Sequence, residues 1–184
     1  MRYDDPMTLR TFLLSLVLAT LAGPQEPVYR DPGLKTIVQV AIVTKNIEAT
    51  TQRWAQLLGV EPPRINITRP GREVKLVYRG RPSDGRAKLA FIRMGQVVLE
   101  FLEPVGGETS WSEHLEKYGE GVQHLGFQVT DLDRTIQSLE RLGIRELHRG
   151  RYDQDNGTYV YMDSKDLLGV TIELLHSDAP RSKQ

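Results

Sequence analysis

One sequence pattern occurs twice in the chain, as VQVAIVTKNIEATTQRWAQLL at residues 38–58 and as QHLGFQVTDLDRTIQSLERLG at residues 123–143. Each copy begins with alternating apolar residues, which predict a strand. Asn46 or Asp131 comes next, and both residue types cap the first turn of a helix. Apolar residues then recur every three or four positions, as in an amphipathic helix, and Gly59 or Gly143 follows. We therefore predict a strand–helix unit that is used twice.

Three further strand-like runs follow each predicted helix. In the first copy they cover residues 73–78, 88–94 and 97–103, and in the second residues 145–149, 158–162 and 170–176. Residues 60–72 contain three prolines and are predicted to form a loop. The sequence thus predicts an α+β fold built from two βαβββ modules.

The chain begins with an apolar run, TFLLSLVLATLA at residues 11–22, preceded by Arg10. About 12 residues are too few for a transmembrane helix, which needs roughly 20, but they suit a signal peptide. We predict an exported protein, periplasmic or extracellular, without a stable membrane anchor after cleavage. The alternative is a cytoplasmic protein with an apolar N-terminal helix. The predicted segments are a signal peptide (1–22), a linker (23–35), the first module (36–104), a connecting short helix (105–121), the second module (122–176) and a tail (177–184).

The composition excludes several classes of function. The chain has 24 basic and 24 acidic residues, without the excess of Lys and Arg that neutralises nucleic-acid phosphates. Nucleic acid is therefore not an expected partner. The sequence contains no cysteine, which excludes disulfides, thiolate zinc sites and cysteine nucleophiles. A bound metal would be held by His, Glu, Asp or Gln.

Four polar residues lie at matching places in the two copies. Gln39 and His124 are on the first strands, and Glu100 and Glu173 are on the last. Strand alternation points Glu100 and Glu173 away from the neighbouring apolar residues that pack on helices. If the two modules pair their sheets, the four side chains meet inside one concavity. We predict that they bind one divalent ion, with open positions for water or substrate, and the donors suit Zn²⁺, Ni²⁺, Co²⁺ or Fe²⁺ without choosing among them.

Other candidate residues have simpler predicted roles. Tyr159 and Tyr161 alternate on one strand and are expected to line the cavity. His114, His148 and His176 are expected to be surface residues.

The doubled unit, the strand starts VQVAIV and QHLGFQVTDLD, and the strand ends LEFLEP and GVTIELLH resemble the vicinal-oxygen-chelate superfamily over about residues 36–176. This superfamily includes glyoxalase I, methylmalonyl-CoA epimerase, extradiol dioxygenases and bleomycin-resistance proteins. The resemblance implies a curved, partly closed mixed sheet with helices outside. It also implies a divalent metal at the positions of Gln39, Glu100, His124 and Glu173. The order of the ligands, Gln, Glu, His, Glu, is similar to the ligand order of animal glyoxalase I, whereas the sequence around the ligands is more like the sequence of an epimerase.

The resemblance implies a metal-dependent isomerase or lyase for a small-molecule substrate. Such enzymes transfer a proton next to a carbonyl through a metal-bound enediolate. Glu173 is the expected base, and Glu100 is expected to return the proton. A metal-dependent dioxygenase and a non-catalytic binding protein of the resistance type remain alternatives. Because two modules pair within one chain, a monomer or a homodimer is expected.

Overall fold

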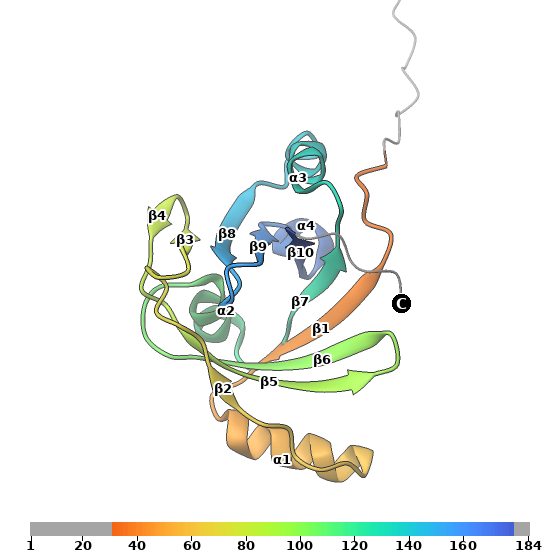
Figure 1. The fold of residues 1–184 in the computed structure, drawn as a ribbon, viewed down its shortest axis with the longest axis vertical. Coiled ribbons are helices and arrows are strands. Elements are labelled where there is room, and N and C mark those ends of the chain that lie inside the picture. Colours follow the sequence, from red (N-terminus) through yellow and green to blue (C-terminus); the bar gives the residue numbers. More distant parts are fainter. Residues whose placement is uncertain (1–30, 179–184) are drawn as a thin grey trace, which may run out of the picture.

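The computed structural model of the chain describes residues 31–178. Ten strands form one mixed sheet that curls around a central space, and the helices α1 (Ile47–Leu58) and α3 (Leu132–Glu140) pack outside it (Figure 1). The predicted α+β fold with a curved sheet is confirmed. The predicted signal peptide, most of the linker and most of the tail lie outside the described residues, so export stays a prediction. No helix within residues 31–178 is long and apolar enough to cross a membrane.

The strands lie in the spatial order β2-β5-β6-β1-β7-β10-β9-β8-β3-β4. The elements follow one another in the chain as β1 (Ile37–Val43), α1 (Ile47–Leu58), β2 (Asn66–Ile67), β3 (Val77–Tyr78), β4 (Arg81–Pro82), β5 (Ala87–Met94), β6 (Val97–Pro104), α2 (Ser110–Tyr118), β7 (Gly121–Gln128), α3 (Leu132–Glu140), β8 (Glu146–Arg151), β9 (Gly157–Met162), α4 (Lys165–Leu168) and β10 (Thr171–Ser177).

The helix boundaries follow from local hydrogen bonds. The side chain of Asn46 accepts from Ala49 N at the start of α1, and the side chain of Asp131 accepts from Arg134 N at the start of α3. Gly59 ends α1 with a φ of 67°, a left-handed conformation that glycine adopts without strain. The connecting helix α2 begins with a capping box between Thr109 and Ser112.

The four strands at the centre of the sheet are those that carry the predicted ligands. β1 pairs in parallel with β6, β7 pairs in parallel with β10, and β1 and β7 join the two halves in antiparallel register. Here the first half means residues 37–104 and the second half residues 121–177. The order β6-β1-β7-β10 therefore places the first and last strands of both halves next to one another.

The middle strands of the first half differ from the prediction. A continuous strand over 73–78 is wrong, because residues 71–75 form turns and Lys75 has a φ of 53°. Only Val77–Tyr78 (β3) is extended, and it pairs with β8 of the second half and with β4. The strand beside β5 is instead β2, which lies within the predicted loop 60–72.

Three clusters of apolar side chains stabilise the two faces of the sheet. Outside, α1 packs on β5 and β6 around Ile47 and Phe101, and α3 packs on β9 and β10 around Ile136 and Leu174. The inner cluster includes Trp111 of α2 together with side chains of β1, β5, β6 and β9. Leu57 and Leu142, which the helical spacing assigns to apolar faces, are 74% and 63% exposed, because each lies at or beyond the end of its helix.

Candidate functional site

The four predicted site residues lie together on the concave face of the sheet. Gln39 and Glu100 come from β1 and β6, and His124 and Glu173 come from β7 and β10. Ala41 of β1 is paired with both Glu100 and His124, so these two residues flank the same point of the central strand. Strand alternation puts the four side chains on the inner face, as predicted.

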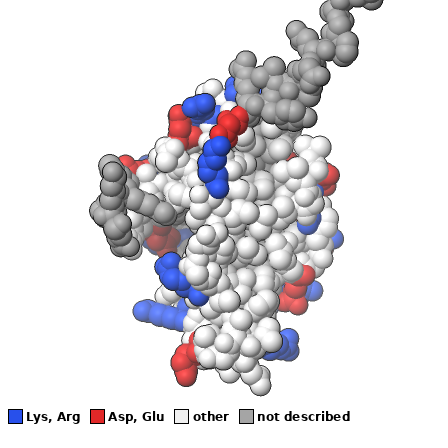
Figure 2. All heavy atoms as spheres, turned by 90° about the vertical axis from the view of Figure 1, so that its right-hand side faces the viewer, with Lys and Arg blue, Asp and Glu red and all other residues white. Residues whose placement is uncertain are grey.

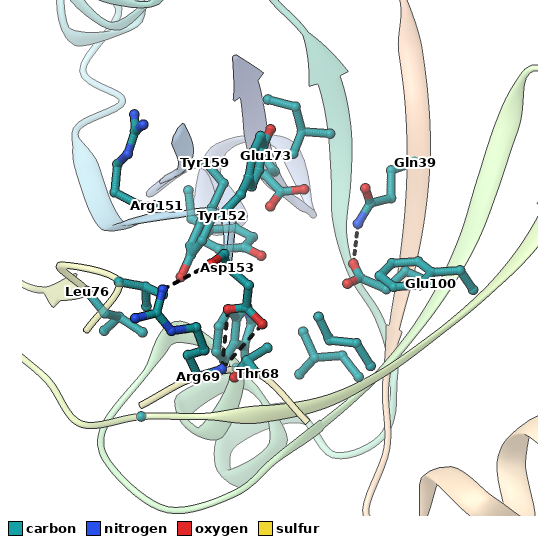
Figure 3. Close-up of a pocket in the computed structure, with 18 residues that line it drawn as sticks. Gln39, Thr68, Arg69, Leu76, Glu100, Arg151, Tyr152, Asp153, Tyr159 and Glu173 are labelled. Carbon is teal, nitrogen blue, oxygen red and sulfur yellow. Dashed lines mark hydrogen bonds between the residues drawn. The ribbon is translucent and has the colours of Figure 1, made fainter. Parts of the chain in front are cut away.

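The imidazole of His124 lies between the two carboxylates. Its Nε2 is 3.2 Å from Glu100 Oε2 and 3.1 Å from Glu173 Oε2. The Gln39 side-chain nitrogen donates to Glu100 Oε2 and lies 3.4 Å from His124 Nε2 (Figure 3). Glu173 Oε2 is buried and accepts no hydrogen bond of good geometry from the described residues. The two carboxylates therefore have unequal surroundings.

Glycine at position 126 leaves room for this group. Gly126 is paired with both Gln39 and Glu173. A Cβ at this position would lie 2.8 Å from Gln39 Cβ and 3.1 Å from Glu173 Oε2. A larger residue would thus push Gln39 and Glu173 away from their present positions.

Burial and charge together set the proton affinities of the site. Burial raises the pKa of Glu100, although the hydrogen bond and positive charge of His124 oppose this effect. Burial alone lowers the pKa of His124, but the negative charges of Glu173 and Glu100 beside the imidazole raise it to about 9. The site therefore favours a positive charge between Glu100 and Glu173.

Gln123 holds the other side of the imidazole. Its side-chain oxygen accepts a hydrogen bond from His124 Nδ1, and the Gln123 side chain is buried. Because Nδ1 is bound to Gln123, Nε2 is the nitrogen that faces the two carboxylates. Sequence reasoning missed Gln123, although its place directly before His124 was a usable signal, since a ligating histidine commonly has a partner on its second nitrogen.

A cavity of about 250 Å³ opens beside the four residues. Gln39, Glu100 and Glu173 line one side of it, and Thr68, Arg69 and Asp153 line another (Figure 3). Tyr159 and Tyr161 line it as well, which agrees with the expectation, and Trp111 adds a further aromatic wall. Sequence reasoning did not assign Trp111 to the cavity, because the position of α2 depends on tertiary packing.

Two histidines expected at the surface are buried. His148 is 0% exposed and lies among aromatic rings, with Trp111 and Tyr161 at centroid distances of 4.7 and 5.0 Å. Burial lowers the pKa of His148 to about 3, and Ser110 Oγ lies 2.9 Å from its Nδ1. His114 is also buried, whereas His176 is half-buried. The expectation was wrong because curling of the sheet and packing of α2 enclose positions that a single strand would expose.

The donor set suits a divalent metal. One imidazole nitrogen, two carboxylates and one amide oxygen are ligands for borderline ions. The separations of 3.1 and 3.2 Å resemble those between neighbouring ligands of an ion with bonds of about 2.1 Å. Within residues 31–178, however, no group of three or more His, Cys, Asp or Glu side chains has the arrangement of a ready-made metal site. The Gln39 amide would also have to turn its oxygen inward, so metal binding by these four residues stays a prediction.

Comparisons with known proteins agree with this fold. The family model described as Glyoxalase/Bleomycin resistance protein/Dioxygenase superfamily matches residues 38–162. The Bacillus subtilis protein YqjC is 28% identical over 90 residues, which cover 48% of this chain and 64% of YqjC, just under two thirds of its length. Mitochondrial methylmalonyl-CoA epimerase of Mus musculus is 21% identical over 137 residues, covering 73% of this chain and 69% of the epimerase.

Solved structures share the fold at low sequence identity. A Streptomyces coelicolor methylmalonyl-CoA epimerase in complex with 2-nitronate-propionyl-CoA has a TM-score of 0.56 and 24% identity, covering 79% of this chain and 99% of the epimerase. The Mycobacterium tuberculosis methylmalonyl-CoA epimerase has a TM-score of 0.55 and 20% identity, covering 81% and 91%. Because the family model covers more than half of the chain, the protein belongs to the glyoxalase/bleomycin resistance protein/dioxygenase superfamily.

Proposed function

We propose that this protein is a metal-dependent isomerase or lyase that transfers a proton at a carbon next to a carbonyl group. The observation that carries the proposal is the pair of buried carboxylates, Glu100 and Glu173, on either side of His124 at one end of a mostly apolar cavity. The similarity to methylmalonyl-CoA epimerases supports the same reaction type. The substrate of those enzymes is not thereby assigned to this chain.

Glu173 is the proposed base. Its Oε2 accepts no hydrogen bond of good geometry from the described residues, so a lone pair is available to take a proton from a carbon in the cavity. Tyr161 lies beside it; burial raises the pKa of the Tyr161 hydroxyl, and the charges of Glu173 and Glu100 add to this effect, so the hydroxyl stays protonated. Glu173 thus faces the cavity without a cationic partner other than His124.

Glu100 is proposed to return the proton from the other side. Glu100 lines the same cavity, and its Oε2 lies 3.2 Å from His124 Nε2, on the other side of the imidazole from Glu173. A divalent ion held by Gln39, Glu100, His124 and Glu173 would supply Lewis-acid stabilisation of negative charge on the substrate oxygens. The walls of the cavity are mostly apolar, which strengthens electrostatic effects within it.

The test combines metal loading with hydrogen exchange. Protein loaded separately with Zn²⁺, Ni²⁺, Co²⁺ or Fe²⁺ is incubated in D₂O with small hydroxycarbonyl and acyl thioester compounds, and deuterium incorporation next to the carbonyl is followed by NMR. We expect exchange that depends on both the metal and Glu173. Oxygen consumption without exchange would instead indicate a dioxygenase, and tight binding without either reaction would indicate a binding protein. Each of these results would overturn the proposal.

A further inference from the structure

One wall of the cavity is a continuous row of aromatic rings. Tyr161 lies against His124 with a centroid distance of 4.9 Å, and Tyr159 follows at 5.7 Å from Tyr161. Tyr152 stacks on Tyr159 at 6.2 Å, and Trp111 lies 5.9 Å from Tyr161. The row therefore runs from the carboxylate site toward Arg69 and Asp153, and it presents π surface along the cavity.

The rest of the interior is also apolar, and it is small. Its aliphatic side chains come from four separate strands or turns, namely Val74, Leu76, Leu89, Leu102 and Leu175. The volume of about 250 Å³ can be compared with cavities of about 150 Å³ that bind benzene. A substituted six-membered ring fits the space between the aromatic row and the aliphatic side.

The two arginines that line the cavity are already bound to other groups of the chain. Arg151 donates five hydrogen bonds, to Asp155, Thr158 and Asp178, which use all the N–H groups of its guanidinium. Arg69 donates to the Glu73 carboxylate at 3.1 Å and to the Asp153 carbonyl at 3.0 Å. Asp153 also lines the cavity, where its negative charge opposes an anionic ligand. The positive charge of each arginine is therefore paired with carboxylates of the chain, Arg69 with Glu73 and Arg151 with Asp155 and Asp178.

We propose that the substrate is a monocyclic aromatic α-hydroxy ketone that is uncharged away from its reacting oxygens. The inference rests on the proposed function for the reacting end of the molecule. The aromatic row favours an aromatic ring at the other end of the substrate, and the ion-paired arginines favour a ring without an anionic substituent. During exchange, Glu173 takes the α-proton, the electron pair moves into the carbonyl, and the same carbon then receives a solvent-derived deuteron, so no oxidant or reductant is needed.

The test compares three probes that share the same reacting oxygens. They are 2-hydroxyacetophenone, hydroxyacetone, which lacks the ring, and the 4-carboxy derivative of 2-hydroxyacetophenone. We expect the kcat/KM for deuterium exchange of 2-hydroxyacetophenone to exceed that of each other probe by roughly 10- to 100-fold, as burial of one ring predicts. Faster exchange of hydroxyacetone or of the carboxy derivative would overturn the inferred substrate class while leaving the proposed function intact.

A binding measurement separates the two proposals. In a Trp54→Phe background, Trp111 is the single tryptophan, and its fluorescence reports occupation of the cavity. We expect 2-hydroxyacetophenone to quench it, and Tyr159→Leu to weaken binding about tenfold, whereas Tyr118→Leu, at an exposed residue outside the cavity, leaves binding unchanged. Quenching without exchange would contradict the proposed function but support the ligand class. Absence of quenching would overturn the ligand class.

Discussion

The first half of the chain contributes Gln39 and Glu100 to the site at the same strand positions where the second half contributes His124 and Glu173, yet the two pairs have different surroundings. Glu100 accepts a hydrogen bond from Gln39, whereas Glu173 Oε2 accepts none of good geometry from the described residues. Gln123 holds His124, while the corresponding position before Gln39 is the apolar Val38. Equivalent strand positions therefore have unequal surroundings, and the second half holds the proposed base.

The halves also differ in what covers the cavity. In the second half the strands β8, β9 and β10 follow one another as a simple antiparallel series. In the first half, the segment after β2 crosses to the strands of the second half, where β3 pairs with β8 on the other side of the cavity. Val74 and Leu76 of this crossing segment line the cavity. The difference shows that the first half closes a site whose most buried groups belong to the second.

The largest expected effect separates the two carboxylates. Glu173→Gln removes the proposed base and should lower the rate of α-proton exchange by about 10²- to 10⁴-fold. Glu100→Gln should leave exchange at the face of Glu173 and slow delivery of a proton to the opposite face. NMR of deuterium incorporation and chiral analysis of the product measure these two rates. Equal loss of exchange in both variants would mean that the carboxylates are not specialised.

The second comparison concerns the residues that precede the two first-strand ligands. Gln123→Leu removes the acceptor for His124 Nδ1 and should weaken metal binding about 10- to 100-fold. Gln123→Glu keeps an acceptor and should restore most of the affinity. Val38→Leu is the matched control in the first half. Titration calorimetry with Zn²⁺ measures all three, and unchanged affinity in Gln123→Leu would show that Gln123 does not position the imidazole.

A third comparison tests the crossing segment. A Cβ on Gly71 would lie 2.3 Å from the carbonyl oxygen of Ser83, so Gly71→Ala must displace backbone near β4. We expect a loss of about 1–3 kcal/mol in the free energy of unfolding and weaker ligand quenching of Trp111. Gly80→Asn is the control, because Gly80 has a φ of 75° that asparagine tolerates, and a Cβ there would meet no atom of the described residues within 4 Å. Ligand affinity that survives Gly71→Ala would mean that this segment does not close the cavity.

The smallest expected effect concerns corresponding leucines at the ends of α1 and α3. Leu57→Gln and Leu142→Gln should each change the free energy of unfolding by less than about 0.5 kcal/mol, because both side chains are largely exposed. Leu139→Ala, within the buried cluster under α3, should cost about 2–5 kcal/mol. Urea denaturation measures the three variants. A large loss in only one of the exposed pair would reveal a contact specific to that half.

The sequence predicted the parts of the fold that depend on local pattern. Strand alternation put Glu100 and Phe101 on opposite faces of the sheet, and likewise Glu173 and Leu174. Asn46 and Asp131 marked the starts of the two helices. The path of residues 60–84 could not be predicted, since β3 acquires its partner from β8, far away in the chain. Burial of His148 likewise depends on Trp111 and Tyr161, which only the closed sheet and α2 bring near it. Short-range patterns thus predicted the strands that carry the site but not what encloses it.

The charged side chains on the surface do not indicate a particular partner. On the face shown in Figure 2, basic and acidic side chains are scattered together rather than gathered into a basic patch. The expectation that nucleic acid is not a partner stays a prediction. The predicted monomer or homodimer stays a prediction.

The most direct test of the account is the metal content of the purified 184-residue protein, measured by elemental analysis after reconstitution with each of Zn²⁺, Ni²⁺, Co²⁺ and Fe²⁺. We predict one divalent ion per chain in the wild type and a loss of that ion in His124→Ala, with Gln39→Leu as a second variant and circular dichroism as the check that both remain folded. Absence of stoichiometric metal from the folded wild type, or its retention in folded His124→Ala, would contradict the central claim that the four central strands build one metal site.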